Sequence, residues 1–207
     1  MYVEENFKEY LDDLAAKKPA PGGGSAAAAV GALGVSLLSM VANFTVGKEK
    51  YKDVEAEMQE LLSSAEKLRA ELQKLVDEDV AVYQNVSAAY RMPKESDAQK
   101  AARSEAIEAA LKAAMQVPLA TCRSLFEAGK LCEPLLEKGN MNLVSDVGVA
   151  AEFIAAGFVS ALMNVEINLS GIKDESLVAN IRRELSPKEK EIQKMREKVV
   201  KGTREKI

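Results

Sequence analysis

Apolar residues recur every three or four positions along most of the chain, the period of helices that bury one face. The alternation of apolar and polar residues that is typical of strands is nearly absent. The clearest stripe lies in a helix predicted over 52–89 and is about 48 Å long at 1.5 Å per residue. Its members have coiled-coil spacing and are Val54, Met58, Leu61, Ala65, Leu68, Leu72, Leu75, Asp79, Val82 and Val86. The pattern predicts an all-α, multi-helical bundle.

Asp79 is the charged member of this stripe. A carboxylate among apolar residues is costly to bury unless it is protonated, paired or facing a polar cavity. Such surroundings also shift a pKa, and shifted pKa values are typical of functional sites. We expect Asp79 to belong to a functional site, and membership of a structural ion pair is the alternative.

A long segment without charge precedes this helix, from Pro19 to Gly47. The prolines and glycines at its start end a first helix predicted over 2–17, and Ser25 is expected to cap a second helix that runs to about Val46. The segment is long enough to cross a bilayer, but its many Gly, Ala and Ser residues make it only modestly hydrophobic. We therefore expect a buried core helix and no membrane partner.

The region after the long stripe begins with the capping box 96–99, which predicts a fourth helix. Pro118 lacks the N–H that an internal helical hydrogen bond needs, so we expect a kink there. Gly129 and Pro134 are expected to interrupt the helix further, and residues 139–140 to end it.

A fifth helix is predicted over 145–169. Asp146 at its start is more often a cap or a helix-dipole partner than a catalyst. Asn164 and Asn168 repeat at the four-residue spacing that places side chains on one face, which suits either interhelical hydrogen bonds or a ligand. Ser186, followed by Pro and with Glu three residues later, is expected to cap a closing helix rich in Lys and Arg.

Composition narrows the class of protein. A length of 207 residues without a low-complexity linker predicts one domain over 1–207. Hydrophobic residues make up 47% of the chain but aromatic residues only 5%, so small aliphatic side chains must build the core. The net charge of −4 argues against a nucleic-acid partner. The acidic amphipathic N-terminus is unlike a secretory signal, so we expect a cytoplasmic protein with Cys122 and Cys132 reduced.

The chain contains no histidine. Its absence excludes Ser-His-Asp and Cys-His triads, and it leaves the two cysteines without the partners of a zinc site, so no metal is expected. Any acid–base step must use Asp, Glu, Lys, Tyr, Cys or water, with a pKa moved by its surroundings.

The glycine-rich loop 22–25 offers free backbone N–H groups at the positive end of a helix, where an anion is favoured. It lacks the Lys-Ser/Thr ending of a P-loop and the strand context of a dinucleotide fingerprint, so we reject nucleotide binding. A flexible helix start is the alternative. Lys48 and Tyr51 follow the second helix, and a Lys there is most often a dipole partner.

Seven short segments resemble those of one family. They lie in the family's order, and the set is specific where its single members are not: Pro21–Ser25, Ser39–Asn43 with Gly47-Lys48, Leu75–Asp79, Val117–Leu119, Gly139-Asn140, Ser145-Asp146 and Asn164–Leu169. The chain resembles the cyclodeaminase domain of formiminotransferase-cyclodeaminase and the related stand-alone methenyltetrahydrofolate cyclohydrolases.

This resemblance implies an intertwined homodimer that binds folate between helices near the subunit contact, with a tetrahydrofolate derivative as substrate and no bound cofactor. The reaction expected first converts 5-formiminotetrahydrofolate to 5,10-methenyltetrahydrofolate and ammonia. The alternative reaction adds water to the methenyl carbon and gives 10-formyltetrahydrofolate. Both pass through a tetrahedral carbon from which nitrogen departs. A non-catalytic helical scaffold is the alternative from another class.

Within that family the motifs suggest roles for individual residues. Asp79 is expected to shuttle protons, and Lys48 and Tyr51 to orient charge. The glycine-rich loop and the basic closing helix are expected to attract the anionic end of folate, including polyglutamylated forms. The candidate substrate-binding residues are Gly22, Gly23, Gly24, Ser25, Asn43, Asn140, Asp146, Asn164 and Asn168.

Overall fold

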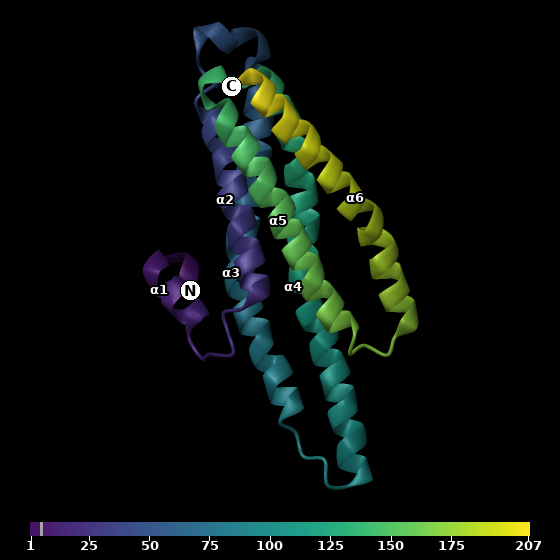
Figure 1. Cartoon of the computed structure of the whole chain (residues 1–207). Coiled ribbons are helices and arrows are strands. Elements are labelled where there is room, and N and C mark those ends of the chain that lie inside the picture. The colour runs from purple at the N-terminus through teal and green to yellow at the C-terminus, as the bar shows by residue number, and fades with distance from the viewer. Residues whose placement is uncertain (5) are drawn as a thin grey trace.

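A computed structural model describes residues 1–4 and 6–207. Every regular element in these ranges is helical, which confirms the predicted all-α class (Figure 1). The predicted first helix divides into a short 3-10 turn and α1, while Glu5 lies outside the described residues. The elements are η1 (Tyr2–Glu4), α1 (Phe7–Ala15), α2 (Gly23–Asn43), η2 (Glu49–Val54), α3 (Glu55–Tyr90), α4 (Asp97–Lys138), η3 (Met141–Leu143), α5 (Val144–Leu169) and α6 (Glu175–Lys206).

Four long helices, α2 to α5, run side by side and form the core (Figure 1). α6 packs along α4 and α5 on one side, and α1 lies on the other side near α2 and α3. The apolar stripe predicted over 52–89 is buried or half-buried along its whole length, as its coiled-coil spacing indicates. Its period therefore identified the face of α3 that packs into the bundle.

Small residues bring α2 and α5 into close antiparallel contact. A Cβ atom at Gly34 would lie 2.9 Å from Ile154 Cγ1 and 3.1 Å from the Ala150 carbonyl oxygen. Near the middle of α5, a Cβ atom at Gly157 would lie 3.1 Å from the Ala27 carbonyl oxygen. Glycine at these positions lets the two backbones approach to a distance that side chains would prevent.

Two segments, Gly23–Asn43 and Met141–Leu169, are long and apolar enough to cross a membrane by length and composition, with mean hydropathies of 1.9 and 1.6. The core helix of a bundle has the same composition, because it too is surrounded by apolar side chains. α2 packs against α3, α4 and α5, as expected for a core helix.

Two predicted helix starts were wrong. α2 begins at Gly23 without a side-chain cap, and the hydroxyl of Ser25 instead lies 3.1 Å from that of Tyr10. α6 begins at Glu175, where Asp174 caps it by accepting a hydrogen bond from the Leu177 N–H at 3.0 Å. In both cases the tertiary environment outweighed a local capping signal.

The motif at 186–187 lies inside α6, because that helix packs as one continuous element against α4 and α5. Its buried residues Ile181, Leu185 and Ile192 lie on both sides of Pro187. The predicted interruptions of α4 at Gly129 and Pro134 are also absent, since α4 is one helix from Asp97 to Lys138.

The helices differ in length, and this difference creates the main cavity. α3 and α4 contain 36 and 42 residues, whereas α2 and α5 contain 21 and 26. The hairpin of α3 and α4 therefore extends beyond the first turn of α2 and the last turn of α5 (Figure 1). The overhang leaves part of the α3–α4 surface uncovered next to two helix ends.

Candidate active site

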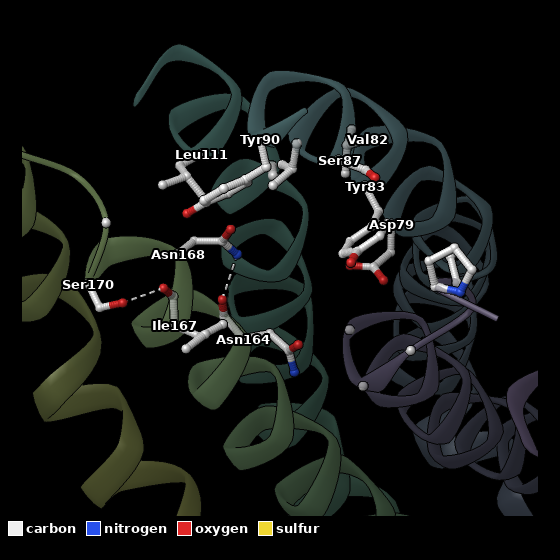
Figure 2. Close-up of a pocket in the computed structure, with 18 residues that line it drawn as sticks. Asp79, Val82, Tyr83, Ser87, Tyr90, Leu111, Asn164, Ile167, Asn168 and Ser170 are labelled. Carbon is white, nitrogen blue, oxygen red and sulfur yellow. Dashed lines mark hydrogen bonds between the residues drawn. The ribbon is translucent and has the colours of Figure 1, made fainter. Parts of the chain in front are cut away.

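A cavity of about 510 Å³ opens at this overhang (Figure 2). We call it the Asp79 cavity. α3 supplies the wall that carries the carboxylate, and the start of α2, part of α4 and the end of α5 complete the lining. The lining residues are Pro19, Ala20, Gly22, Gly23, Gly24, Asp79, Val82, Tyr83, Val86, Ser87, Tyr90, Leu111, Ala114, Asn164, Ile167, Asn168, Ser170 and Gly171.

The carboxylate of Asp79 lies against the first turn of α2. The backbone N–H of Ser25 donates a hydrogen bond of 2.9 Å to Asp79 Oδ2. A Cβ atom at Gly24 would lie only 2.1 Å from Asp79 Oδ1, so this position needs glycine for the carboxylate to approach the helix start. Free N–H groups in the first turn make this helix end a favourable place for negative charge.

Burial raises the pKa of Asp79, and the hydrogen bond from Ser25 opposes the rise without cancelling it. No cation in the described part of the chain contributes to this pKa, so the structure does not support the alternative of a structural ion pair. A half-buried carboxyl with a raised pKa can hold a proton and release it nearer to neutral pH, as a proton shuttle requires.

A buried tyrosine supports this arrangement from α1. The hydroxyl of Tyr10 lies 3.1 Å from Ser25 Oγ, and the Ser25 backbone binds Asp79. Burial raises the pKa of Tyr10, and the charge of Asp79 raises it further, so the phenol stays neutral. Tyr10 could not be assigned to the site from the sequence, because its contact with Ser25 joins α1 to α2 across the loop.

The two asparagines of α5 line the opposite wall. Asn164 Nδ2 donates to the Ser160 carbonyl at 2.8 Å, and Asn168 Nδ2 donates to the Asn164 carbonyl at 2.8 Å. These bonds lie within α5, so the amides do not make the interhelical bonds that were one of the two expectations. Figure 2 shows both side chains along the cavity wall, and Asn164 faces Gly23.

Two tyrosines that were not predicted as site residues also line the cavity. Tyr83 and Tyr90 follow Asp79 on α3 by four and eleven residues, and their side chains are 42% and 51% exposed. Their spacing from Asp79 on one helix was the signal that could have identified them. Exposed aromatic rings in a cavity wall are suited to stacking against a flat ring system.

The other predicted site residues lie at the far end of the bundle. Asn43 and Lys48 are exposed at the end of α2, and Asp146 lies in the first turn of α5. There, the Tyr51 hydroxyl contacts Asn140 Oδ1 at 3.4 Å. α2 has 21 residues and spans about 30 Å at 1.5 Å per residue, so these residues cannot touch a small molecule in the Asp79 cavity of the same chain.

Within one chain the predicted residues thus form two groups. The cavity group contains Gly22, Gly23, Gly24, Ser25, Asp79, Asn164 and Asn168. Ser25 belongs to it because its backbone N–H binds Asp79. The distal group contains Asn43, Lys48, Tyr51, Asn140 and Asp146. In the distal group Asn140 has a structural task, because its Nδ2 donates to the Phe44 carbonyl at 3.1 Å and its backbone N–H to Thr45 Oγ1 at 3.0 Å.

The fold and cavity define an all-helical protein with a half-buried carboxylate at a glycine-rich helix start. Residues 6–187 match the model of the formiminotransferase-cyclodeaminase family. The chain belongs to this family of folate one-carbon cyclodeaminases and cyclohydrolases. This confirms the resemblance seen in the motifs.

Individual relatives refine this placement. The chain is 44% identical over 185 residues to the methenyltetrahydrofolate cyclohydrolase of Methylorubrum extorquens, covering 89% of each. It is 30% identical to the formimidoyltransferase-cyclodeaminase of Rattus norvegicus, but it spans only 34% of that longer protein. The crystal structure of formiminotetrahydrofolate cyclodeaminase from Thermotoga maritima has a TM-score of 0.81 and 32% identity, covering 100% of this chain and 97% of the other.

Proposed function

We propose that this chain is a methenyltetrahydrofolate cyclohydrolase, which adds water to 5,10-methenyltetrahydrofolate and releases 10-formyltetrahydrofolate. The observation that carries the proposal is the Asp79 carboxyl, which lies in the cavity at a helix N-terminus and has a raised pKa. Such a group can supply the acid–base chemistry that either reaction needs. The 44% identity over nearly the whole of both chains favours hydrolysis over deamination. This reverses the order of the two reactions expected from the motifs alone.

The proposed mechanism uses Asp79 as base and then as acid. Water attacks the methenyl carbon while Asp79 takes a proton from it, which gives a tetrahedral carbon that bears a hydroxyl group. When the bond from this carbon to N5 breaks, Asp79 returns its proton to N5, while the hydroxyl group releases its own proton to solvent and its oxygen becomes the formyl oxygen. The N–H groups at the start of α2 would stabilise negative charge that develops on this oxygen.

Cyclodeamination is the second candidate, because the cyclodeaminase of known structure matches this chain over its whole length. In that reaction N10 attacks the formimino carbon of 5-formiminotetrahydrofolate, and ammonia departs. A carboxyl that takes the N10 proton and protonates the departing amine would serve it equally well. The two reactions thus place the same demand on Asp79 and differ in nucleophile and leaving group.

A paired assay tests the proposal. The purified chain is given 5,10-methenyltetrahydrofolate, and loss of the methenyl absorbance is compared with the enzyme-free rate. In a separate reaction it is given 5-formiminotetrahydrofolate, and both ammonia and the methenyl absorbance are followed. We expect accelerated hydrolysis in the first reaction. Ammonia release without hydrolysis would establish the second candidate, and inertness in both assays would leave the scaffold alternative.

The same proposal includes a homodimer formed through α2 and α5. Each helix carries a stripe at coiled-coil spacing that no other helix of the chain fully covers. Leu33 on α2 is 49% exposed, and Met163 and Ile167 on α5 are 66% and 69% exposed. On α2 the stripe comprises Gly23, Ala26, Val30, Leu33, Leu37, Met40 and Phe44. On α5 it comprises Val149, Phe153, Ala156, Ser160, Met163 and Ile167. Apolar stripes of this length favour a second copy as their cover.

A two-fold axis perpendicular to α2 and α5 would bring the two groups of predicted site residues close together. It would place the end of α2 in one copy beside the start of α2 in the other. The second copy's Lys48 and Tyr51 would then approach the Asp79 cavity, although they lie about 30 Å from it within one chain.

A cytoplasmic location fits the two cysteines, Cys122 and Cys132, which are buried and form no disulfide.

A further inference from the structure

A second hollow adjoins the end of the Asp79 cavity that lies away from the carboxylate. Its volume is about 270 Å³, and we call it the cationic hollow. Gly171 lines both spaces, so they meet at the turn after α5. In Figure 2, Tyr90 and Leu111 mark the end of the Asp79 cavity that is far from Asp79. The hollow is lined by Lys94, Lys100, Arg103, Ser104, Ile107, Gly171 and Lys173.

One face of α4 connects the two spaces. Leu111 lines the Asp79 cavity, and Ile107 and Arg103 line the cationic hollow one and two turns before it. Eight residues separate Arg103 from Leu111, which is about 12 Å along the helix axis. A long, narrow ligand with its reacting end at Asp79 would therefore extend its other end along this face.

Arg103 marks the junction between the cavity and the hollow. Its guanidinium donates to the Tyr90 carbonyl at 2.9 and 3.3 Å and lies 5.7 Å from the centre of the Tyr90 ring. Lys173 Nζ donates to Ser104 Oγ at 2.7 Å. Both cations are held by neutral oxygens, so these contacts do not neutralise their charges. Lys100 differs, because it pairs with Asp97 at 2.9 Å.

We propose that the cationic hollow binds the γ-linked glutamate tail of the substrate, and that this contact orients the one-carbon end toward Asp79. The inference rests on the proposed function, because it takes a tetrahydrofolate as the ligand, and it holds for either reaction. Each added glutamate brings one carboxylate, which a cluster of Arg and Lys attracts. The basic closing helix, expected from the sequence to attract this tail, lines neither space.

A binding experiment without turnover tests the assignment. Calorimetry measures the dissociation constants of 5-formyltetrahydrofolate carrying one or five glutamates, at low and high salt. The wild-type chain is compared with two triple variants: Lys94→Gln/Arg103→Gln/Lys173→Gln, and the control Lys194→Gln/Lys198→Gln/Lys201→Gln on α6. The control removes the same number of charges from exposed positions of the closing helix.

We expect the wild-type chain and the α6 control to bind the pentaglutamate more tightly, with a salt dependence. The hollow variant should lose roughly tenfold of this preference, since a few partly exposed ion pairs each contribute a small factor. Equal affinity of the wild-type chain for both ligands, or loss of the preference in the α6 control alone, overturns the assignment. Failure to bind the monoglutamate, together with inertness in the paired assay, would instead refute the proposed function.

Discussion

The surroundings of the Asp79 carboxyl are built by the start of α2, which α1 in turn supports. Ser25 provides the N–H, Gly24 provides the space, and Tyr10 contacts the Ser25 hydroxyl. A hydrogen bond to a carboxylate lowers its pKa while burial raises it, and here burial dominates. The group is thereby suited to exchange protons in a protein without histidine.

Replacing Asp79 by Asn should lower turnover by about 10²–10⁴-fold, because it removes the acid–base group and keeps its shape. The measurement is kcat for the methenyl substrate, with thermal unfolding recorded in parallel. Glu78→Gln is the matched control, since Glu78 is the next residue and pairs with Lys74 on the surface. Near-normal turnover in a readily unfolding Asp79→Asn protein would mean that Asp79 is structural.

The raised pKa of Asp79 also predicts how stability depends on pH. The folded state retains this proton to higher pH than the unfolded chain does, so the contribution of Asp79 is fully present below its unfolded pKa. It is lost as pH rises through the folded pKa. Relative to Asp79→Asn, the wild-type protein should therefore lose unfolding free energy over that rise, as measured by urea denaturation at several pH values. A difference that does not change with pH would contradict the raised pKa.

Three glycines lie just before or in the first turn of α2, and replacing each by alanine should lower kcat/KM to a different degree. A Cβ atom meets nothing within 4 Å at Gly22, Asn164 Nδ2 at 3.3 Å at Gly23, and Asp79 Oδ1 at 2.1 Å at Gly24. The loss of kcat/KM should thus be largest for Gly24→Ala and smallest for Gly22→Ala. Equal losses in the three variants would show that loop flexibility, and not close approach, is what the glycines provide.

At the scale of elements, the contact between α2 and α5 depends on missing side chains. A Cβ atom added at Gly34 would lie 3.1 Å from the Ala150 carbonyl oxygen, and one added at Gly157 would lie 3.1 Å from the Ala27 carbonyl oxygen. Because backbone atoms cannot rotate away as a side chain can, an added side chain at Gly34 must move a helix. The register of these helices also positions Asn164 opposite Gly23, so packing and cavity geometry are coupled.

Gly34→Leu should lower the unfolding free energy by about 1–3 kcal/mol, as overpacking of a core does. Urea denaturation measures this change, and Ala70→Leu at an exposed position of α3 is the control for added bulk. The control should remain within about 0.5 kcal/mol of the wild-type protein. If Gly34→Leu were equally neutral, α2 and α5 would have to separate at little cost.

At the scale of the whole molecule, the residues predicted for the site lie at both ends of the bundle. The cavity group and the distal group are separated by the length of α2. The partly exposed stripe on α2 and the exposed stripe on α5 lie between them. A dimer through these stripes would bury apolar surface and would also join each cavity to the other copy's distal group.

Subunit complementation tests this shared arrangement. Asp79→Asn and Lys48→Met are each expected to be poorly active as pure dimers. Mixing them under conditions of subunit exchange should restore up to about a quarter of wild-type activity, since about half the dimers are mixed and one site in each is intact. Light scattering measures whether each protein is dimeric. Mixed dimers without recovered activity would show that Lys48 does not act in the cavity of its partner.

The hydrophobic period alone was enough to predict the fold class and the buried face of one helix. It identified the all-α class and the buried face of α3, because a helix in a bundle must repeat its apolar residues every three to four positions. The single charge on the α3 stripe indicated Asp79 as a candidate site residue, since a carboxylate there needs polar surroundings. The ordered motifs identified the family, which the whole-chain similarities confirm.

Only the tertiary structure decided which of these residues meet. Periodicity describes one helix at a time, so it carries no information on the offset between helices. That offset placed Asp79 beside Gly24, left Lys48 and Tyr51 at the far end, and added Tyr10 to the site. Local capping signals failed at Ser25 for the same reason. A cap contributes about 1 kcal/mol, which the packing of a whole helix readily exceeds.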